Sequence, residues 1–227
     1  MKVYFDDFIY GSIDGAVTTF AIVAGVMGAS LPSVIILILG FANLFADGFS
    51  MAAANYQASK ARNEFIEMKR KQEEWEIDNL EEQEKDEIRD IYKEKGFKDK
   101  LLEDVVRIIT SRRKVWIDTM MKEELGLIED GKNPMQSSVS TFVGFNIVGL
   151  IPLIPFMIFM VIGIEANSEA FVYSTVSVLA AFFLVGMIKG KIVKKSMLYS
   201  GISTLIIGGI AAVVAYLVGY GLNFLIS

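Results

Sequence analysis

Long apolar runs alternate along this chain with one charge-rich stretch. Five runs are long enough to cross a hydrocarbon core, which needs about 20 helical residues. They lie near residues 9–30, 33–56, 136–161, 169–189 and 198–225. Only a tight hairpin separates the first two, with Pro32 expected in the first turn of the second helix. The pattern predicts an all-α membrane protein of five transmembrane helices, with an insertion between the second and third.

The insertion itself is expected to be helical. Residues 49–95 contain neither glycine nor proline, so the second helix should continue out of the membrane to about Asp78. Asp78 and Asn79 both favour turns and helix starts, which predicts a break there. The helices expected after the break cover about residues 80–95, 98–112 and 114–127.

Most of the charge lies in this insertion. Residues 60–132 hold 17 of the 22 Lys and Arg residues and 21 of the 27 Asp and Glu residues, although 53% of the whole chain is hydrophobic. We therefore divide the chain into a first pair of transmembrane helices at 1–58, a polar helical domain at 59–133 and three transmembrane helices at 134–227.

The loops predict the orientation in the membrane. Five spans place the N-terminus, the insertion and the fourth-to-fifth connection on one side. That connection contains Lys189, Lys191, Lys194 and Lys195. The opposite loop at 163–169 is acidic, so the positive-inside rule places the N-terminus and 59–133 in the cytoplasm and the C-terminus on the other side. The compact chain, without plant-type targeting extensions, favours a prokaryotic plasma membrane over an organelle.

Cysteine and histidine are both absent. Disulfide frameworks and zinc sites of the Cys/His type are therefore excluded. Di-iron oxidases in helical bundles ordinarily use Glu-x-x-His pairs, so the lack of histidine also argues against such an enzyme. We expect no enzymatic activity, no catalytic residues, no tightly bound cofactor and no nucleic-acid partner.

The second span carries a polar column, since Asn43, Asp47 and Met51 recur every fourth residue and share one helix face. A carboxylate at membrane depth costs about 2.5–3.5 kcal/mol on insertion scales and usually marks an ion or proton pathway. Asp14 in the first span is either an interfacial cap or the partner of Asp47 on the neighbouring helix. Two such carboxylates repel unless a cation or proton bridges them, which indicates a binding site where protons and metal compete.

The insertion offers a second candidate site, formed by two Glu-x-x-Glu pairs. Glu73 and Glu76 form one pair, and Glu84 and Glu87 the other. If the chain reverses near residue 78, the pairs face one another with oxygen ligands that suit hard divalent cations. Glutamate-rich helix faces are also commonly just solvated, so spacing alone leaves both interpretations open.

Three further residues favour the metal interpretation. Met120, Met121 and Glu124 share roughly one helix face. Methionine is normally a core filler. A thioether beside a carboxylate is less usual, and it favours a borderline transition metal such as Fe²⁺ over Mg²⁺ or Ca²⁺.

The order of these parts resembles the vacuolar iron transporter family over nearly the whole chain. The more specific part is Met-Met-x-x-Glu-Leu-Gly-Leu followed by a Pro-x-x-Pro span, whereas a bare Glu-x-x-Glu is not specific. The matching pieces are Asp14-Gly15, Ser50-Met51, the two Glu-x-x-Glu pairs, residues 116–127 and residues 149–155.

This resemblance implies a homodimer of five-helix subunits that moves Fe²⁺, and often Mn²⁺, out of the cytoplasm in exchange for protons. It implies a membrane path at Asp14 and Met51. It also implies metal ligands at Glu73, Glu76, Glu84, Glu87, Met120, Met121 and Glu124. The partners expected are the lipid bilayer, divalent metal ions, protons and a second copy of the chain.

The chain departs from many eukaryotic members at one position. Where they carry a glutamate in the second span, this sequence has Asn43, and Asp47 lies one turn further along. Either the carboxylate has moved by a turn, about 5.4 Å along the axis, or proton coupling differs because asparagine does not titrate. We favour relocation.

Two alternatives to an iron exporter stay open. The first is a manganese or broad-specificity divalent cation exporter, which sequence cannot separate from an iron exporter. The second is a non-transporting membrane metal sensor. Asp47 argues against the sensor, because a sensor needs no intramembrane carboxylate.

Overall fold

A computed structural model describes residues 4–129, 131–163 and 168–226. The chain separates into two compact units, one formed by Met1–Gln57 and Lys132–Ser227, the other by Ala58–Gly131. All the regular elements in the described residues are helices. The fold is therefore all-α, as the sequence predicts.

Five helical stretches are long and apolar enough to cross a membrane, which confirms the predicted number of spans. Their helices are α1 (Phe5–Gly28), α2 (Val34–Asn79), α6 (Pro134–Gly149), α7 (Ile154–Val161), α8 (Ser168–Ile192) and α9 (Met197–Ile226). The second helix runs on without a break into the polar region, as expected from its lack of glycine and proline. Only its first part, to about Ala54, is apolar.

Two predicted details of these spans are wrong. The third span is not one helix, because a 3₁₀ turn, η3 (Ile151–Leu153), separates α6 from α7. Pro152 and Pro155 lie at this break, where each removes one backbone donor from the ladder. Pro32 also lies outside the first turn of α2, which begins at Val34; its carbonyl oxygen accepts from Ile35 N, 3.0 Å away.

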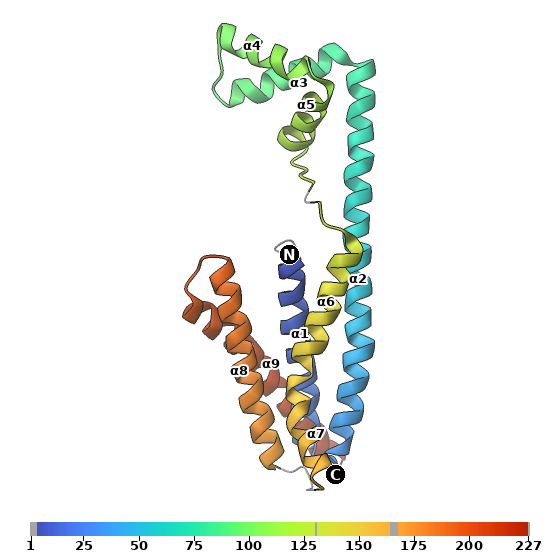
Figure 1. Ribbon diagram of the computed structural model, residues 1–227, viewed down its shortest axis with the longest axis vertical. Coiled ribbons are helices and arrows are strands. Elements are labelled where there is room, and N and C mark those ends of the chain that lie inside the picture. Colours follow the sequence, from blue (N-terminus) through green and yellow to red (C-terminus); the bar gives the residue numbers. More distant parts are fainter. Residues whose placement is uncertain (1–3, 130, 164–167, 227) are drawn as a thin grey trace. The chain divides into compact units, whose positions relative to one another are not determined.

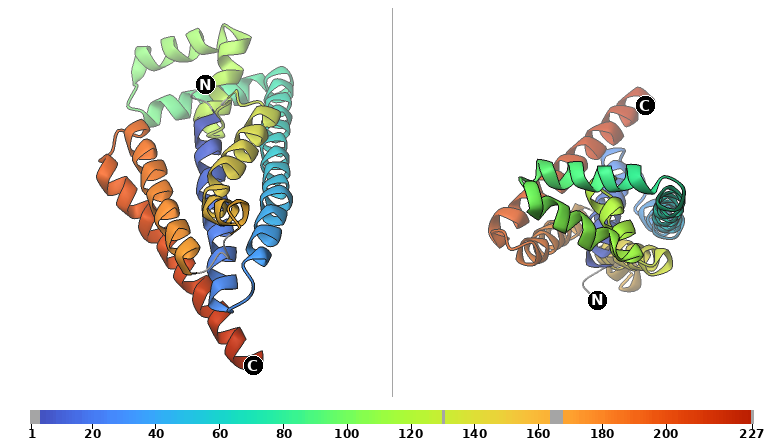
Figure 2. Two further views of the ribbon diagram at one scale, coloured as in Figure 1. Left: turned by 60° about the horizontal axis from the view of Figure 1, so that its bottom comes forward. Right: turned by 90° about the horizontal axis from the view of Figure 1, so that it is seen from above.

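Helix α1 is the centre of the first unit and packs against α6, α8 and α9 (blue in Figures 1 and 2). The approach to α6 depends on glycine. A Cβ at Gly11 would lie 2.1 Å from the carbonyl oxygen of Thr141, and one at Gly15 would lie 2.3 Å from that of Phe145. Small residues are the usual means by which membrane helices bring their backbones together.

The second unit contains the polar end of α2 and four short elements. These are α3 (Glu81–Glu94), α4 (Asp99–Thr110), α5 (Arg113–Thr119) and the π-helix η2 (Met120–Glu124). Ile66, Ile77 and Ile88 belong to its core, together with Trp116. The unit thus has its own hydrophobic core.

The predicted helix boundaries in this unit are close, with one correction. The last helix is not α-helical to Leu127, because it changes to π geometry at Met120, where Leu125 N donates to Met120 O over 3.2 Å. Asn79 lies at the predicted break, but its side chain donates back to Trp75 O rather than capping α3. The acidic loop used for orientation falls mostly on residues 164–167, which lie outside the described residues.

Candidate functional site

Polar side chains of α1 and α2 pair along the line where these helices face each other. Asn43 Nδ2 of α2 donates to Thr18 Oγ1 and Thr19 Oγ1 of α1, at 3.2 and 3.4 Å. One turn along, Asp47 lies within electrostatic range of Asp14. We call this series of contacts the polar ladder. It joins the predicted residues Asn43, Asp47 and Asp14 on facing helices.

The single chain only partly covers the ladder. Asp14, Asn43, Asp47 and Met51 are all half-buried. The side chain of Met51 packs against the apolar core of the first unit. The predicted column on α2 is therefore neither sealed inside the subunit nor fully exposed.

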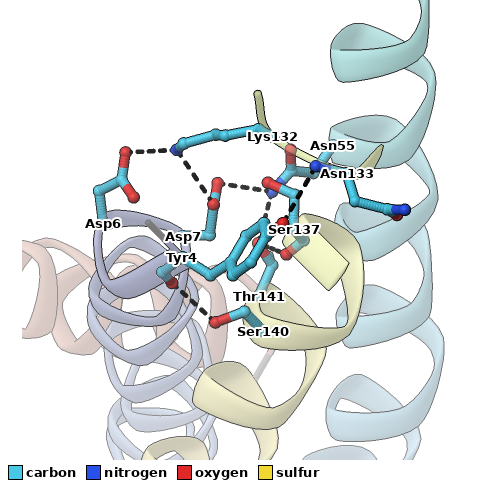
Figure 3. Close-up of polar contacts among 9 residues, drawn as sticks. All are labelled: Tyr4, Asp6, Asp7, Asn55, Lys132, Asn133, Ser137, Ser140 and Thr141. Atoms are coloured by element: carbon cyan, nitrogen blue, oxygen red, sulfur yellow. Dashed lines mark hydrogen bonds and ion pairs between the residues drawn. The ribbon is translucent and has the colours of Figure 1, made fainter. Parts of the chain in front are cut away.

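A further rung, at Asn55, was missed by sequence reasoning. Its side-chain nitrogen donates to Asp7 Oδ1 at 3.1 Å and to Thr141 Oγ1 at 2.6 Å (Figure 3). The signal was present, since Asn55 continues the four-residue spacing beyond Met51 and Asp7 lies two turns before Asp14. The ladder thus extends from Thr18 and Asn43 to Asp7 and Asn55.

The second unit brings the two Glu-x-x-Glu pairs together. Glu73 and Glu84 are each only 2% exposed, and each has an oxygen without a hydrogen-bond partner among the described residues. The charges of five carboxylates act on one another. We call these five the carboxylate cluster: Glu73, Glu76, Glu84, Glu87 and Glu124.

Burial raises the pKa of glutamates in this cluster. For Glu73 it is the main cause of a pKa of about 7, and the negative charge of Glu124 raises this pKa further. Burial likewise raises the pKa of Glu84 to about 7, followed by the charge of Glu87. The pKa of Glu124 is also raised, chiefly by burial. A cation placed among these groups would offset their repulsion and desolvation.

The two predicted methionine ligands lie in the core of this unit. Met120 is fully buried and Met121 is 3% exposed, and both contribute to the cluster around Trp116. They begin the π-helix that ends at Glu124. Short π segments occur frequently at functional sites, and this one places two thioethers and two carboxylates within five residues.

The carboxylates gather without forming a finished coordination shell. Within the part of the chain that the structure describes, no three carboxylates already stand as a metal-holding group. Gln72 and Gln83 each donate to one glutamate, Glu76 at 3.0 Å and Glu87 at 3.2 Å. A cation that binds here would compete with these two amides for the carboxylates of Glu76 and Glu87.

Comparison with known proteins agrees with the motif-based resemblance. The model of the VIT family matches residues 5–220. The chain is 36% identical to a vacuolar iron transporter of Toxoplasma gondii, over 96% of this chain and 74% of that protein. It is 34% identical to a vacuolar iron transporter of Plasmodium falciparum, covering 96% and 82%.

A plant protein matches nearly as well. Vacuolar iron transporter 1 of Arabidopsis thaliana is 33% identical, over 92% of this chain and 82% of that protein. The matched region includes both the spans and the insertion, so the agreement does not rest on hydrophobic composition alone. The chain therefore belongs to the VIT family.

Proposed function

We propose that this protein exports Fe²⁺, and also Mn²⁺, from the cytoplasm in exchange for protons. The observation that carries the proposal is the polar ladder, in which the charges of Asp14 and Asp47, on two apolar helices, act on each other. Carboxylates at membrane depth are costly and typical of ion and proton pathways. Membership of a family whose relatives are named as vacuolar iron transporters supports iron as the cargo.

In the proposed sequence of events, metal and protons compete for the carboxylates of the two aspartates. Metal entering the ladder meets the thioether of Met51 and then the carboxylates of Asp47 and Asp14. Protons from the far side compete for those same carboxylates and release the ion. Asn43 supplies an amide rather than a titratable group, so Asp47 takes the place of the glutamate of many eukaryotic members.

The insertion, residues 59–133, is proposed to collect metal on the cytoplasmic side. The carboxylate cluster supplies hard oxygen ligands, and Met120 and Met121 supply soft sulfur. Together they suit a borderline ion such as Fe²⁺ better than Mg²⁺ or Ca²⁺. The carboxylate oxygens among these ligands also suit Mn²⁺.

Orientation and assembly belong to the same proposal. The lysines at the end of α8 and beyond it support a cytoplasmic location for that end, the N-terminus and the insertion. A homodimer is part of the proposal: Phe45 and Phe49, 65% and 69% exposed on the side of α2 away from the ladder, give a second copy an apolar face to cover. A prokaryotic plasma membrane remains our proposed location, although the relatives are named for the vacuole.

Reconstituted liposomes test the proposal. Wild-type protein should move Fe²⁺ and Mn²⁺ when a proton gradient of the opposite direction is imposed, and collapsing the gradient with an ionophore should stop it. Asp14→Ala and Asp47→Asn should each abolish most of the flux. Wild-type flux in either variant would contradict the membrane pathway. Competition among Fe²⁺, Mn²⁺, Zn²⁺ and Co²⁺ separates an iron and manganese exporter from a broad divalent one.

A further inference from the structure

The end of the polar ladder at Asn55 carries a cationic side chain. Lys132 Nζ lies 2.7 Å from Asp6 Oδ2 and 3.2 Å from Asp7 Oδ2 (Figure 3). Lys132 is the residue at which the chain re-enters the first unit after the insertion. Its ammonium is therefore shared between Asp6 and Asp7, and Asp7 is the last carboxylate of the ladder.

Both oxygens of Asp7 are occupied. Asn55 donates to Oδ1 and Lys132 to Oδ2, and the Asp7 side chain is only 13% exposed. Asp6, at 70% exposure, is the outer partner of the same lysine. An incoming cation would therefore compete with the ammonium for Oδ2 of Asp7.

The backbone beside Lys132 is held by its neighbour Asn133, and the lysine side chain is partly exposed. Asn133 N donates to Tyr4 Oη at 3.1 Å, and Asn133 Oδ1 caps α6 by accepting from Met135 N at 2.9 Å. The lysine side chain is 21% exposed. Movement of the ammonium away from Asp7 would need only rotations of this long side chain, not a change in the backbone that starts α6.

We infer that Lys132 occupies the position of a cation at the entrance of the ladder and sets the apparent affinity of the pathway for divalent metal. The inference rests on the proposed transport function and adds to it a residue outside the predicted path. The lysine competes with metal for Asp7. It therefore weakens the binding of metal at the entrance, and it balances the charge of Asp7 when no metal is bound. It acts on transport through Asp7 and is not itself a metal ligand.

The absence of native cysteine makes a direct test possible. Lys132→Cys is purified and labelled in detergent with 2-aminoethyl methanethiosulfonate, which restores a terminal amine, or with methyl methanethiosulfonate, which adds a neutral group. Both forms are then reconstituted, and Mn²⁺ uptake is measured over a range of concentrations. Lys195→Cys, exposed in another loop, receives the same labels as the control.

The two labels should give different apparent KM values with similar maximal rates. The neutral form should have a KM for Mn²⁺ about fivefold below that of wild type, the size expected for loss of one partly exposed ion pair. The amine form should return toward wild type, and the Lys195→Cys forms should not differ. Equal KM values for the two labelled Lys132→Cys forms would overturn the inference, because the charge is what the two labels are chosen to vary. A wild type without any flux would instead overturn the proposed function itself.

Discussion

Glu73 of α2 and Glu84 of α3 are buried carboxyls, and the charge of Glu73 contributes to the raised pKa of Glu84. They come from opposite sides of the helix break after Asn79. Neither has a basic residue as its main partner; burial is the larger cause of the raised pKa in both. The pair is therefore costly in its charged state, and this cost gives the insertion a pH dependence that can be measured.

The stability of the metal-free insertion should fall as pH rises from about 4.5 to above 7. Both pKa values are raised from 4.5 to about 7 in the folded state, so the folded protein binds more protons than the unfolded one in this interval. The stabilisation is complete below the unfolded value and is lost as pH passes through the folded one. Both tryptophans, Trp75 and Trp116, lie in the insertion, so urea unfolding followed by tryptophan fluorescence reports on this unit.

Glu84→Gln should weaken that dependence and stabilise the metal-free protein at pH 8. The change removes a buried charge that has little compensation, an effect of about 1–3 kcal/mol. Glu82→Gln is the matched control, since Glu82 is exposed and pairs with Lys85 at 2.9 Å. A stability profile of Glu84→Gln parallel to that of wild type across pH 5–8 would contradict the assignment.

Binding of Mn²⁺ to the insertion should release protons. Glu73 and Glu84 are largely protonated at pH 6 and must ionise to coordinate a cation. The apparent affinity of full-length protein should therefore increase by about tenfold or more between pH 6 and 7. Isothermal titration in buffers of different ionisation enthalpy measures the protons released per metal, and a value of zero at pH 6 would exclude these two glutamates as ligands.

The ion pair between Lys95 and Glu123 should support the metal ligands that we propose in η2. Lys95 follows α3, and Glu123 lies inside the π-helix next to Glu124. Lys95→Met should leave Glu123 paired only with Lys122, 3.1 Å away within η2, and weaken Mn²⁺ binding about threefold to fivefold, whereas Lys95→Arg should retain it. Lys100→Met, on the exposed surface of α4, serves as the control. Equal affinity of Lys95→Met and wild type would show that η2 holds its geometry without the pair.

Replacement of Gly15 tests the close contact of α1 with α6. A Cβ there would lie 2.3 Å from a carbonyl oxygen, so Gly15→Ala should destabilise the membrane unit by about 1–3 kcal/mol. Gly25→Ala, in the same helix, is the control, because a Cβ there would make only an ordinary van der Waals contact at 3.7 Å. Thermal unfolding in detergent should separate the two variants, and equal melting temperatures would contradict so close an approach of α1 to α6.

The relocation of the membrane carboxylate can be tested by restoring the family pattern. Asp47→Ala should abolish metal flux, and Asn43→Glu in that background should recover part of it, because the two positions are one turn apart on the same face. Asn43→Gln in the same background is the control, since it keeps the polar character without the charge. No difference between the two double variants would show that position 43 cannot host the carboxylate.

Periodicity and composition alone were enough to predict the spans and the long second helix. The apolar runs specified five spans, and the lack of glycine and proline over 49–95 specified that α2 continues without a break into the polar region. The motifs also identified the family. These features follow from local chemistry, since burying a polar group in lipid or interrupting a helix is costly whatever the rest of the chain does.

Which side chains meet could be learned only from the packed helices. The π geometry at Met120, the 3₁₀ turn at Pro152 and the contacts of Asn55 with Asp7 and Thr141 were not predicted from the sequence. Lys132 showed no spacing or motif that linked it to residues 6 and 7. A helical period fixes the face on which a residue lies, but the partner across that face depends on how closely the helices approach, which for α1 and α6 depends on the glycines of α1.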